Sequence, residues 1–470
     1  ETEKSAESAT PVQSASPFSE QQISTLQQAL DLAVQHLIAG DLSKAENIYQ
    51  QILQTDPNQP IALHLLGVIF YQEGEYDRAV DLITKAITIK PDYAEAHSNL
   101  SVTLKELGRL EEAVTSCRHA LAIMPELAEA NYNLGIALQG LGKLDEAVAS
   151  YQNALSTKPD YAEANYYLGV AFQGLGKTDE AVANYQNALS IKPDHAAAHC
   201  NLGTALQELG KLKIAVVSYQ KAIDIKPDYV EAYNNLGTAL KELGQLDEAI
   251  DSYHKAIGIK PDYAEAYSNL AAALQQLGRV DEAVANCHNA LSIKPDFADA
   301  HSNLGAAFQD LGQLENAVAS YHTALDIKPE FALAHNNLGA AYGELRRLDD
   351  AVMHYRKAIA INPEFPMALT NLGNMLRELG RLDEAVATCQ KALAISPEYA
   401  EAYSNLGNAL LSLGKQDEAA ASYREALSIK PDYVQAGRNL LLGLLYVPGL
   451  PLEELFTEHL RFAKNQARDI

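Results

Sequence analysis

The sequence predicts an all-α solenoid, in which short helical hairpins stack side by side around a continuous core, and three observations support that fold class. A proline recurs every 34 residues without insertion or deletion, at Pro57, Pro91, Pro125, Pro159, Pro193, Pro227, Pro261, Pro295, Pro329, Pro363, Pro397 and Pro431. An alanine recurs with the same period, at Ala45, Ala79, Ala113, Ala147, Ala181, Ala215, Ala249, Ala283, Ala317, Ala351, Ala385 and Ala419. Each period also holds two runs of apolar residues at helical spacing. A fixed period of this size is typical of supersecondary units that bury their apolar faces against their neighbours.

The charge and hydropathy of the chain limit its partners. The 470 residues include 36 basic and 61 acidic side chains, a formal net charge of −25, and such a surface repels the phosphates of nucleic acids. No apolar run reaches the ~20 residues that cross a bilayer, and the first twenty residues lack an apolar signal core. We therefore expect a soluble cytoplasmic protein that contacts neither nucleic acid nor membrane. The start at Glu1 rather than methionine fits a piece of a longer protein.

Three parts are expected along the chain. Residues 1–22 are polar and low in complexity, so they cannot bury enough apolar surface to offset the entropy of ordering, and we predict disorder there. Twelve tandem 34-residue repeats follow over residues 23–433. Residues 434–470 depart from the period and are predicted to form capping helices.

Residues 128–161 illustrate one repeat. Its first helix is predicted over about Ala128–Leu141, and Gly142 ends it because glycine adopts the left-handed conformation at no steric cost. Its second helix is predicted over about Asp145–Thr157, and Pro159 prevents its continuation. Small residues recur where the two helices meet, so the helices are expected to approach closely. Twelve antiparallel helix pairs follow from twelve such periods.

Six residues recur at fixed offsets from one period to the next. In the repeat above they are Leu134, Gly135, Ala147, Tyr151, Ala154 and Pro159. This pattern resembles the tetratricopeptide repeat family over roughly residues 26–440, although the tryptophan of the family's general pattern is absent from the chain. The resemblance implies a right-handed superhelix whose first helices line the concave side. It also implies a protein–protein interaction function that binds extended peptide segments in that groove.

The last segment carries two further predictions. Residues 434–446 are expected to form a final first-type helix, and residues 450–470 a helix that covers the end of the array with one apolar stripe of Leu452, Leu455, Phe456, Leu460 and Ala463. The stretches NLLLGLLY and EELFTEHLRFA resemble the junction between repeats and catalytic region in bacterial O-linked N-acetylglucosamine transferases, including SPINDLY-type proteins. That resemblance implies substrate recognition for a transferase. The chain reaches Ile470 before a glycosyltransferase domain could begin, so no catalytic residue and no cofactor is assigned, and whether the parent protein is an enzyme stays open.

Ten asparagines mark the predicted peptide-binding surface. Each follows a recurrent proline by eight residues, and only Leu65 and Tyr167 interrupt the run of Asn99, Asn133, Asn201, Asn235, Asn269, Asn303, Asn337, Asn371, Asn405 and Asn439. Asparagine forms helices less readily than alanine, so its recurrence calls for a reason, and its amide both donates and accepts hydrogen bonds. Repeats stack at roughly 10 Å and an extended chain advances ~3.3–3.6 Å per residue, so one asparagine would meet about every third peptide residue. The resemblance to the O-linked transferases implies the same use, because asparagines at the matching position form such a ladder in that family.

Two positions beside the asparagines are expected to set the ligand preference. One is mostly acidic: Glu95, Glu129, Glu163, Glu231, Glu265, Asp299 and Glu401. The other varies: Ser98, Tyr132, Tyr166, Cys200, Asn234, Ser268, Ser302, Asn336, Thr370 and Ser404. Hydroxyl-rich or basic segments are expected in such a groove, with a role at the helix N-terminus as the alternative for the acidic set.

The sequence leaves other interpretations open. In one, the asparagines only brace neighbouring repeats. In another, the chain is a stand-alone scaffold that assembles a multiprotein complex without a linked enzyme. A chaperone adaptor that clamps a C-terminal carboxylate needs clustered basic residues, but this face has only scattered ones such as Lys105, Lys241 and Arg377. A homodimer is a further partner that the sequence leaves open.

The remaining signals are expected to be structural. Three cysteines fall at a core position that most repeats fill with tyrosine: Cys117, Cys287 and Cys389. Cys200 has no cysteine near it, so neither a disulfide nor a zinc site is predicted. Residues 174–178 end like a phosphate loop but follow a helix rather than a strand. His195 and His199 have the spacing of metal ligands, but His195 falls at an aromatic position before the helix, so no metal site is predicted.

Overall fold

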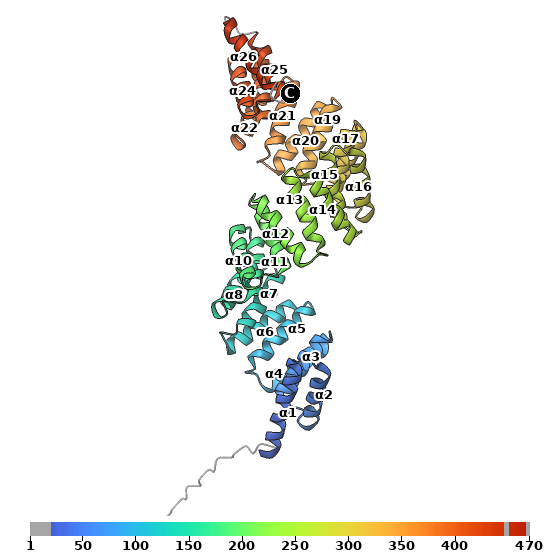
Figure 1. Cartoon of the computed structure of the whole chain (residues 1–470), viewed down its shortest axis with the longest axis vertical. Coiled ribbons are helices and arrows are strands. Elements are labelled where there is room, and N and C mark those ends of the chain that lie inside the picture. The colour runs from blue at the N-terminus through green and yellow to red at the C-terminus, as the bar shows by residue number, and fades with distance from the viewer. Residues whose placement is uncertain (1–19, 446–450, 467–470) are drawn as a thin grey trace, which may run out of the picture. The chain divides into compact units, whose positions relative to one another are not determined.

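The computed structural model describes residues 20–445 and 451–466, which form 26 helices and no strand. Figure 1 shows these helices joined by short turns into successive hairpins. Contacts divide the chain into two units, Glu1–Pro227 and Asp228–Ile470, and each unit is a stack of hairpins. The predicted all-α solenoid of twelve hairpins with additional C-terminal helices is therefore confirmed for the described residues.

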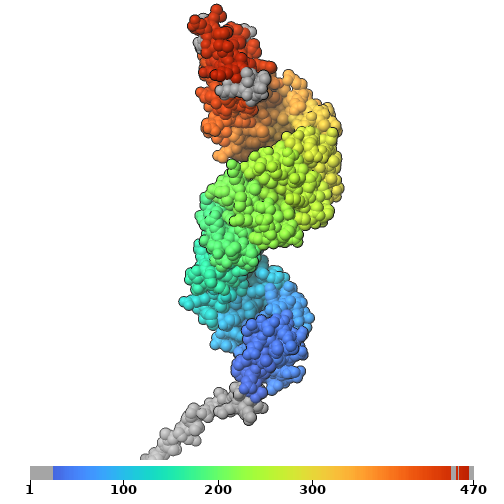
Figure 2. All heavy atoms as spheres, viewed as in Figure 1, coloured from blue at the N-terminus to red at the C-terminus, as the bar shows by residue number. Residues whose placement is uncertain are grey.

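Odd-numbered helices are the first members of the hairpins and even-numbered helices the second. Unit 1 contains α1 (Glu20–Ile38), α2 (Leu42–Thr55), α3 (Pro60–Gln72), α4 (Tyr76–Ile89), α5 (Ala94–Glu106), α6 (Leu110–Ile123), α7 (Ala128–Gly140), α8 (Leu144–Thr157), α9 (Ala162–Gly174), α10 (Thr178–Ile191), α11 (Ala196–Glu208) and α12 (Leu212–Ile225). Unit 2 contains α13 (Val230–Glu242), α14 (Leu246–Ile259), α15 (Ala264–Gln276), α16 (Val280–Ile293), α17 (Ala298–Asp310), α18 (Leu314–Ile327), α19 (Ala332–Glu344), α20 (Leu348–Ile361), α21 (Pro366–Glu378), α22 (Leu382–Ile395), α23 (Ala400–Ser412), α24 (Gln416–Ile429), α25 (Val434–Leu444) and α26 (Leu452–Gln466). Within each unit, successive hairpins form a continuous surface (Figure 2). None of the described helices combines the length and the apolar character that crossing a membrane requires.

The first helix begins within the segment 1–22. Residues 1–19 of the segment predicted to be disordered lie outside the described residues, but α1 already begins at Glu20. Leu26, Leu30 and Ala33 pack into the first hydrophobic cluster of unit 1. Once these residues hold a helix, each preceding residue that joins it gains a backbone hydrogen bond, so the polar residues 20–22 are helical as well.

The two helices of a hairpin meet where a glycine faces a tyrosine. A Cβ atom at Gly135 of α7 would lie 2.4 Å from a ring carbon of Tyr151 of α8, and Tyr151 is fully buried. The same close approach recurs at Gly169, Gly203, Gly237, Gly305, Gly339 and Gly407. Because the ring fills the space that a side chain on the first helix would need, this fit fixes how closely each hairpin closes.

The three cysteines at the tyrosine position are confirmed as packed core residues. Cys117, Cys287 and Cys389 are fully buried, and burial raises the pKa of the first to about 11 and of the other two to about 12. The facing position adapts to the smaller side chain in two of these hairpins. Ser101 replaces the glycine and hydrogen-bonds Cys117, and Ala271 replaces it in the hairpin of Cys287.

The C-terminal helix α26 does not dock through the predicted stripe. Four of the five predicted residues are exposed: Leu452, Phe456, Leu460 and Ala463. Leu455 packs against the last core cluster of unit 2. Beside it, Glu458 is 8% exposed and accepts a hydrogen bond from Arg424 Nε at 2.9 Å, while the Phe462 ring packs on Gly437 of α25. The apolar period indicated the wrong face because the helix instead buries Glu458, which pairs with the more exposed Arg424, and packs the Phe462 ring on a glycine.

Candidate functional site

The ten predicted asparagines each lie on an odd-numbered helix. They occupy one position of α5, α7, α11, α13, α15, α17, α19, α21, α23 and α25, and each is half-buried. Leu65 of α3 and Tyr167 of α9 hold the same position in the two hairpins that lack the asparagine. We call the ten residues the asparagine ladder.

Eight of the ten ladder nitrogens bond to the preceding odd-numbered helix of the same unit, whereas those of Asn235 and Asn337 make no such bond among the described residues. In unit 1, Asn99 Nδ2 lies 2.8 Å from His64 Nε2, Asn133 Nδ2 donates to Ser98 Oγ at 3.1 Å, and Asn201 Nδ2 donates to Tyr166 OH at 3.2 Å. In unit 2 the corresponding pairs, donor first, are Asn269–Asn234 Oδ1 at 3.0 Å, Asn303–Ser268 Oγ at 3.0 Å, Asn371–Asn336 Oδ1 at 3.1 Å, Asn405–Thr370 O at 3.3 Å and Asn439–Asn408 Oδ1 at 2.8 Å. The nitrogen half of these amides therefore braces neighbouring hairpins.

The oxygen half of several ladder amides remains available. A backbone carbonyl only accepts hydrogen bonds, so Asn303, which contacts Ser268 O at 3.1 Å, and Asn405, which contacts Thr370 O, must turn their nitrogens toward the neighbouring helix. No described residue donates to the Oδ1 atoms of Asn269, Asn303, Asn371 and Asn405. Three other oxygens accept intramolecular bonds: those of Asn235, Asn337 and Asn439. Unit 2 thus presents hydrogen-bond acceptors at repeated positions.

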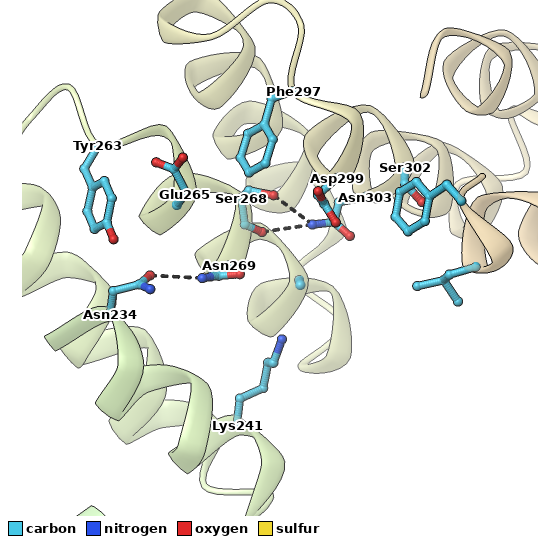
Figure 3. Close-up of a pocket in the computed structure, with 13 residues that line it drawn as sticks. Asn234, Lys241, Tyr263, Glu265, Ser268, Asn269, Phe297, Asp299, Ser302 and Asn303 are labelled. Carbon is cyan, nitrogen blue, oxygen red and sulfur yellow. Dashed lines mark hydrogen bonds between the residues drawn. The ribbon is translucent and has the colours of Figure 1, made fainter. Parts of the chain in front are cut away.

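A cavity of about 320 Å³ lies over two of these rungs, Asn269 and Asn303 (Figure 3). Aromatic residues from the turns before α15, α17 and α19 contribute to its walls: Tyr263, Phe297 and Phe331. Lys241 of α13 points into the cavity, and burial lowers its pKa. The charge of Glu242, the next residue of the helix, acts on this pKa in the opposite direction. Eight of the thirteen residues that line the cavity are polar or charged, so the aromatic rings stand among groups that can hydrogen-bond a ligand.

The acidic residues beside the ladder are largely paired with lysines. The carboxylate–ammonium distances are 3.5 Å for Glu129–Lys158, 3.6 Å for Glu163–Lys192, 3.7 Å for Glu265–Lys294 and 3.7 Å for Glu401–Lys430. These acidic residues lie in the first turn of their helices, where negative charge is favourable. Because the lysines already neutralise them, the paired residues give little preference for basic ligands.

A cluster of aromatic rings occupies the corresponding place in unit 1. Tyr167 of α9 holds the ladder position, and Tyr132 of α7 holds the position that binds the ladder nitrogen in other hairpins. Their ring centroids lie 5.9 Å apart. The distance between ring centroids is 5.0 Å for Tyr132 and Tyr161, 5.0 Å for Tyr166 and Tyr167, and 4.7 Å for Tyr166 and His195. We call Tyr132, Tyr161, Tyr166, Tyr167 and His195 the tyrosine patch. The sequence placed Tyr132 and Tyr166 among the positions expected to set the ligand preference, but it did not predict that they meet Tyr161, Tyr167 and His195. The interruption of the asparagine run at Tyr167 was the signal for the cluster.

His195 and His199 each contact a backbone atom. His199 Nε2 lies 3.0 Å from Pro193 O, and His195 Nδ1 accepts from the Ala198 amide at 3.2 Å. No group of three or more histidine, cysteine or acidic residues suited to a metal ion occurs in residues 20–445 or 451–466. Residues 174–178 run from the last residue of α9 to the first of α10, and Gly176 in the turn between them has a φ of 72°.

Models of one family match most of the chain. Those described as "Tetratricopeptide repeat" match residues 36–99, 70–118, 332–365 and 364–432, and one described as "TPR repeat" matches seven segments between residues 103 and 346. Among proteins with curated descriptions, none matches the sequence.

Three solved structures resemble the chain to different extents. The APC/C hetero-tetramer Cut9-Hcn1 is 17% identical over 89% of this chain and 96% of that one, with a TM-score of 0.50, which shows a common fold. Yeast Tom70 is 16% identical over 95% of this chain and 97% of that one, with a TM-score of 0.45. MamA is 28% identical over 34% of this chain and 95% of that one, with a TM-score of 0.33.

Proposed function

The chain belongs to the tetratricopeptide repeat family, and from that premise we propose that it binds extended peptide segments of partner proteins along the asparagine ladder of unit 2. The observation that carries the proposal is the orientation of the ladder amides. In Asn269, Asn303, Asn371 and Asn405 the nitrogen is held by the neighbouring helix, and the oxygen is left to accept. An amide fixed in this way loses little further freedom when a ligand N–H binds it.

The spacing of the rungs suits an extended chain. Odd-numbered helices of neighbouring hairpins stack at roughly 8–10 Å, and three residues of an extended peptide cover roughly the same distance. Each rung would therefore accept one backbone N–H from every third residue, whatever the side chains are. The cavity over Asn269 and Asn303 would hold a short side chain, and its serine, asparagine and lysine groups favour a hydroxyl-rich segment.

The test removes three rungs of unit 2. We expect Asn235→Ala, Asn269→Ala and Asn303→Ala together to weaken binding of a fluorescent 15-residue serine- and threonine-rich peptide about tenfold or more, as measured by fluorescence anisotropy. A matched variant removes three asparagines of even-numbered helices, Asn286, Asn289 and Asn316, and should bind like the wild type. Equal affinity in the ladder variant, or loss of its helical circular dichroism at 25 °C, would assign the ladder to bracing alone.

A finer proposal concerns the protein to which the repeats contribute. We propose that they recognise substrates for an O-linked N-acetylglucosamine transferase-like protein of the cytoplasm, on the strength of the sequence resemblance within residues 439–463. The alternative is a stand-alone scaffold that assembles other proteins. The reading frame after Ile470 separates them, because a glycosyltransferase sequence there supports the first proposal and a stop codon supports the second.

Self-association has separate support in unit 1. Ile214 and Val217 of α12 are 55% and 53% exposed and line a cavity of about 580 Å³ with residues of α10 and α11. No other repeat has an apolar residue at the position of Ile214. We propose a second copy of the chain as the occupant. Sedimentation velocity should show a dimer that Ile214→Glu dissociates, and a wild-type monomer at 50 μM would refute this surface.

A further inference from the structure

We propose that the tyrosine patch of unit 1 is a second peptide site, which binds proline-rich segments in the polyproline II conformation. Its rings stand where the asparagine ladder is interrupted, and they come from three consecutive hairpins. The four tyrosines are half-buried, so each offers part of a ring to a ligand. Proline-rich segments characteristically dock on grooves lined by aromatic side chains.

The hydroxyl groups of the patch supply what a proline-rich backbone needs. No residue in the described part of the chain hydrogen-bonds the hydroxyls of Tyr132 or Tyr167. Tyr166 OH accepts from Asn201, which leaves its own hydrogen to donate. Burial raises the pKa of Tyr132 above its ordinary value, so this hydroxyl keeps its proton at neutral pH. A polyproline II helix has no internal hydrogen bonds and leaves its carbonyls as unpaired acceptors.

At position 167 the patch lacks the amide oxygen that a ladder asparagine would offer to a peptide N–H. A ladder asparagine at position 167 would offer an amide oxygen to a backbone N–H, and Tyr167 removes that oxygen. Proline has no N–H to satisfy. The substitution therefore replaces the amide oxygen with a ring and with a hydroxyl that can donate as well as accept. A segment without N–H groups can use the ring and the donated hydrogen and leaves no N–H unsatisfied.

The dimensions of the ligand and the patch agree. A polyproline II helix has three residues per turn and a rise of 3.1 Å per residue, so residues on one face recur every ~9 Å. Neighbouring odd-numbered helices stack at roughly 8–10 Å. Tyr132 and Tyr166 are one repeat apart, on α7 and α9. Prolines at positions i and i+3 of a ligand would therefore meet one ring each.

The charges around the patch favour an uncharged segment over a basic one. The chain as a whole carries a net charge of −25, but the carboxylates nearest the rings, Glu129 and Glu163, are paired with Lys158 and Lys192. Lys158 also lies over the Tyr161 ring, 4.4 Å from its centroid. An arginine or lysine of a ligand would meet a ring face that already holds a cation.

The test uses the whole chain with two ten-residue fluorescent probes, decaproline and a glycine–serine peptide. We expect decaproline to bind more tightly. The variant Y132S/Y166S/Y167N places in the patch the residues that unit 2 has at the same positions, and it should weaken decaproline binding about tenfold or more. The variant Y132F/Y166F/Y167F keeps the rings and should weaken decaproline binding about threefold to tenfold, because it removes the hydroxyl donors. It also removes the acceptor of Asn201 Nδ2. If the first variant has a lowered melting temperature, the phenylalanine variant provides the test in its place.

The outcomes separate this site from the asparagine ladder. The variant N269A/N303A should bind decaproline like the wild type, so failure of the proposed function leaves this inference intact. Equal binding of the two probes by the wild type would overturn it. The inference would also be overturned if both tyrosine variants bound decaproline as tightly as the wild type. It would likewise be overturned if the wild type bound an arginine–glycine peptide of the same length more tightly than decaproline.

Discussion

The tyrosine patch of unit 1 and the cavity of unit 2 are built from equivalent positions of different repeats. At the ladder position, Asn303 has an amide oxygen without a described donor, whereas Tyr167 has a hydroxyl and a ring. At the neighbouring position, Ser268 braces Asn303 through its carbonyl and hydroxyl oxygens, whereas Tyr132 contributes another ring. The hairpin therefore fixes where a side chain stands. Two substitutions per repeat then decide whether the surface suits a backbone with N–H groups or one without them.

The largest effect is expected in the interior that both surfaces share. In Gly305→Ala the new methyl group would lie 2.7 Å from the Tyr321 ring, and we expect a loss of about 1–3 kcal/mol in the free energy of unfolding. Tyr321→Cys creates a cavity and should cost about 3–5 kcal/mol. The double variant should lose less than the sum by about 1 kcal/mol or more, because Ala271 and Cys287 already form this pair in another hairpin. Urea denaturation measures all three, and strictly additive losses would contradict a paired fit.

Acid should distinguish the first rung of unit 1 from the rungs of unit 2. His64 holds the position that is Ser98 in the next hairpin, and its ring contacts Asn99 Nδ2 at 2.8 Å and Tyr93 OH at 2.9 Å. Burial lowers the pKa of His64 from 6.5 to about 4. The folded state thus takes up a proton less readily than the unfolded state, so its full stability is present above pH 6.5 and is lost as the pH falls toward 4. The loss reaches up to about 3 kcal/mol near pH 4.

The matched variant for this effect is His64→Ser, which introduces the side chain of the next hairpin. It lowers stability at pH 7.5 because the ring is lost, but it removes the titrating group. The difference in melting temperature between wild type and variant should therefore narrow as the pH falls from 6.5 to 4.5. Parallel curves over that range would show that His64 is not the group responsible.

The sequence predicted the hairpins and the register of the asparagines, because both follow from a period that sets which residues share a helix face. It did not predict the direction of the amides, which depends on whether the residue 35 positions earlier presents a carbonyl, as Thr370 does, or a hydroxyl. The tyrosine patch was missed because Tyr132, Tyr161 and Tyr167 belong to different hairpins or turns and meet only after stacking. The docking of α26 was predicted wrongly because the period of its apolar residues carries no information about the ion pair of Glu458.

The smallest effect concerns the braces, where the two units again differ. Asn133 of unit 1 donates to Ser98 Oγ and to no other described atom, whereas Asn303 of unit 2 donates to both Ser268 Oγ and Ser268 O. We expect Ser98→Ala to cost about 1 kcal/mol in the free energy of unfolding and Ser268→Ala about half of that, because the carbonyl still holds the amide of Asn303. For the same reason, Ser268→Ala should leave the affinity of unit 2 for the serine- and threonine-rich peptide within about twofold of the wild type. Urea denaturation and fluorescence anisotropy measure these two quantities. Ser268→Ala could instead weaken peptide binding as strongly as removal of the rungs does. In that case the Ser268 hydroxyl, and not the backbone carbonyl, would orient the amide oxygen of Asn303. The ladder oxygens of unit 2 would then depend on the variable neighbouring position, as the tyrosine patch does.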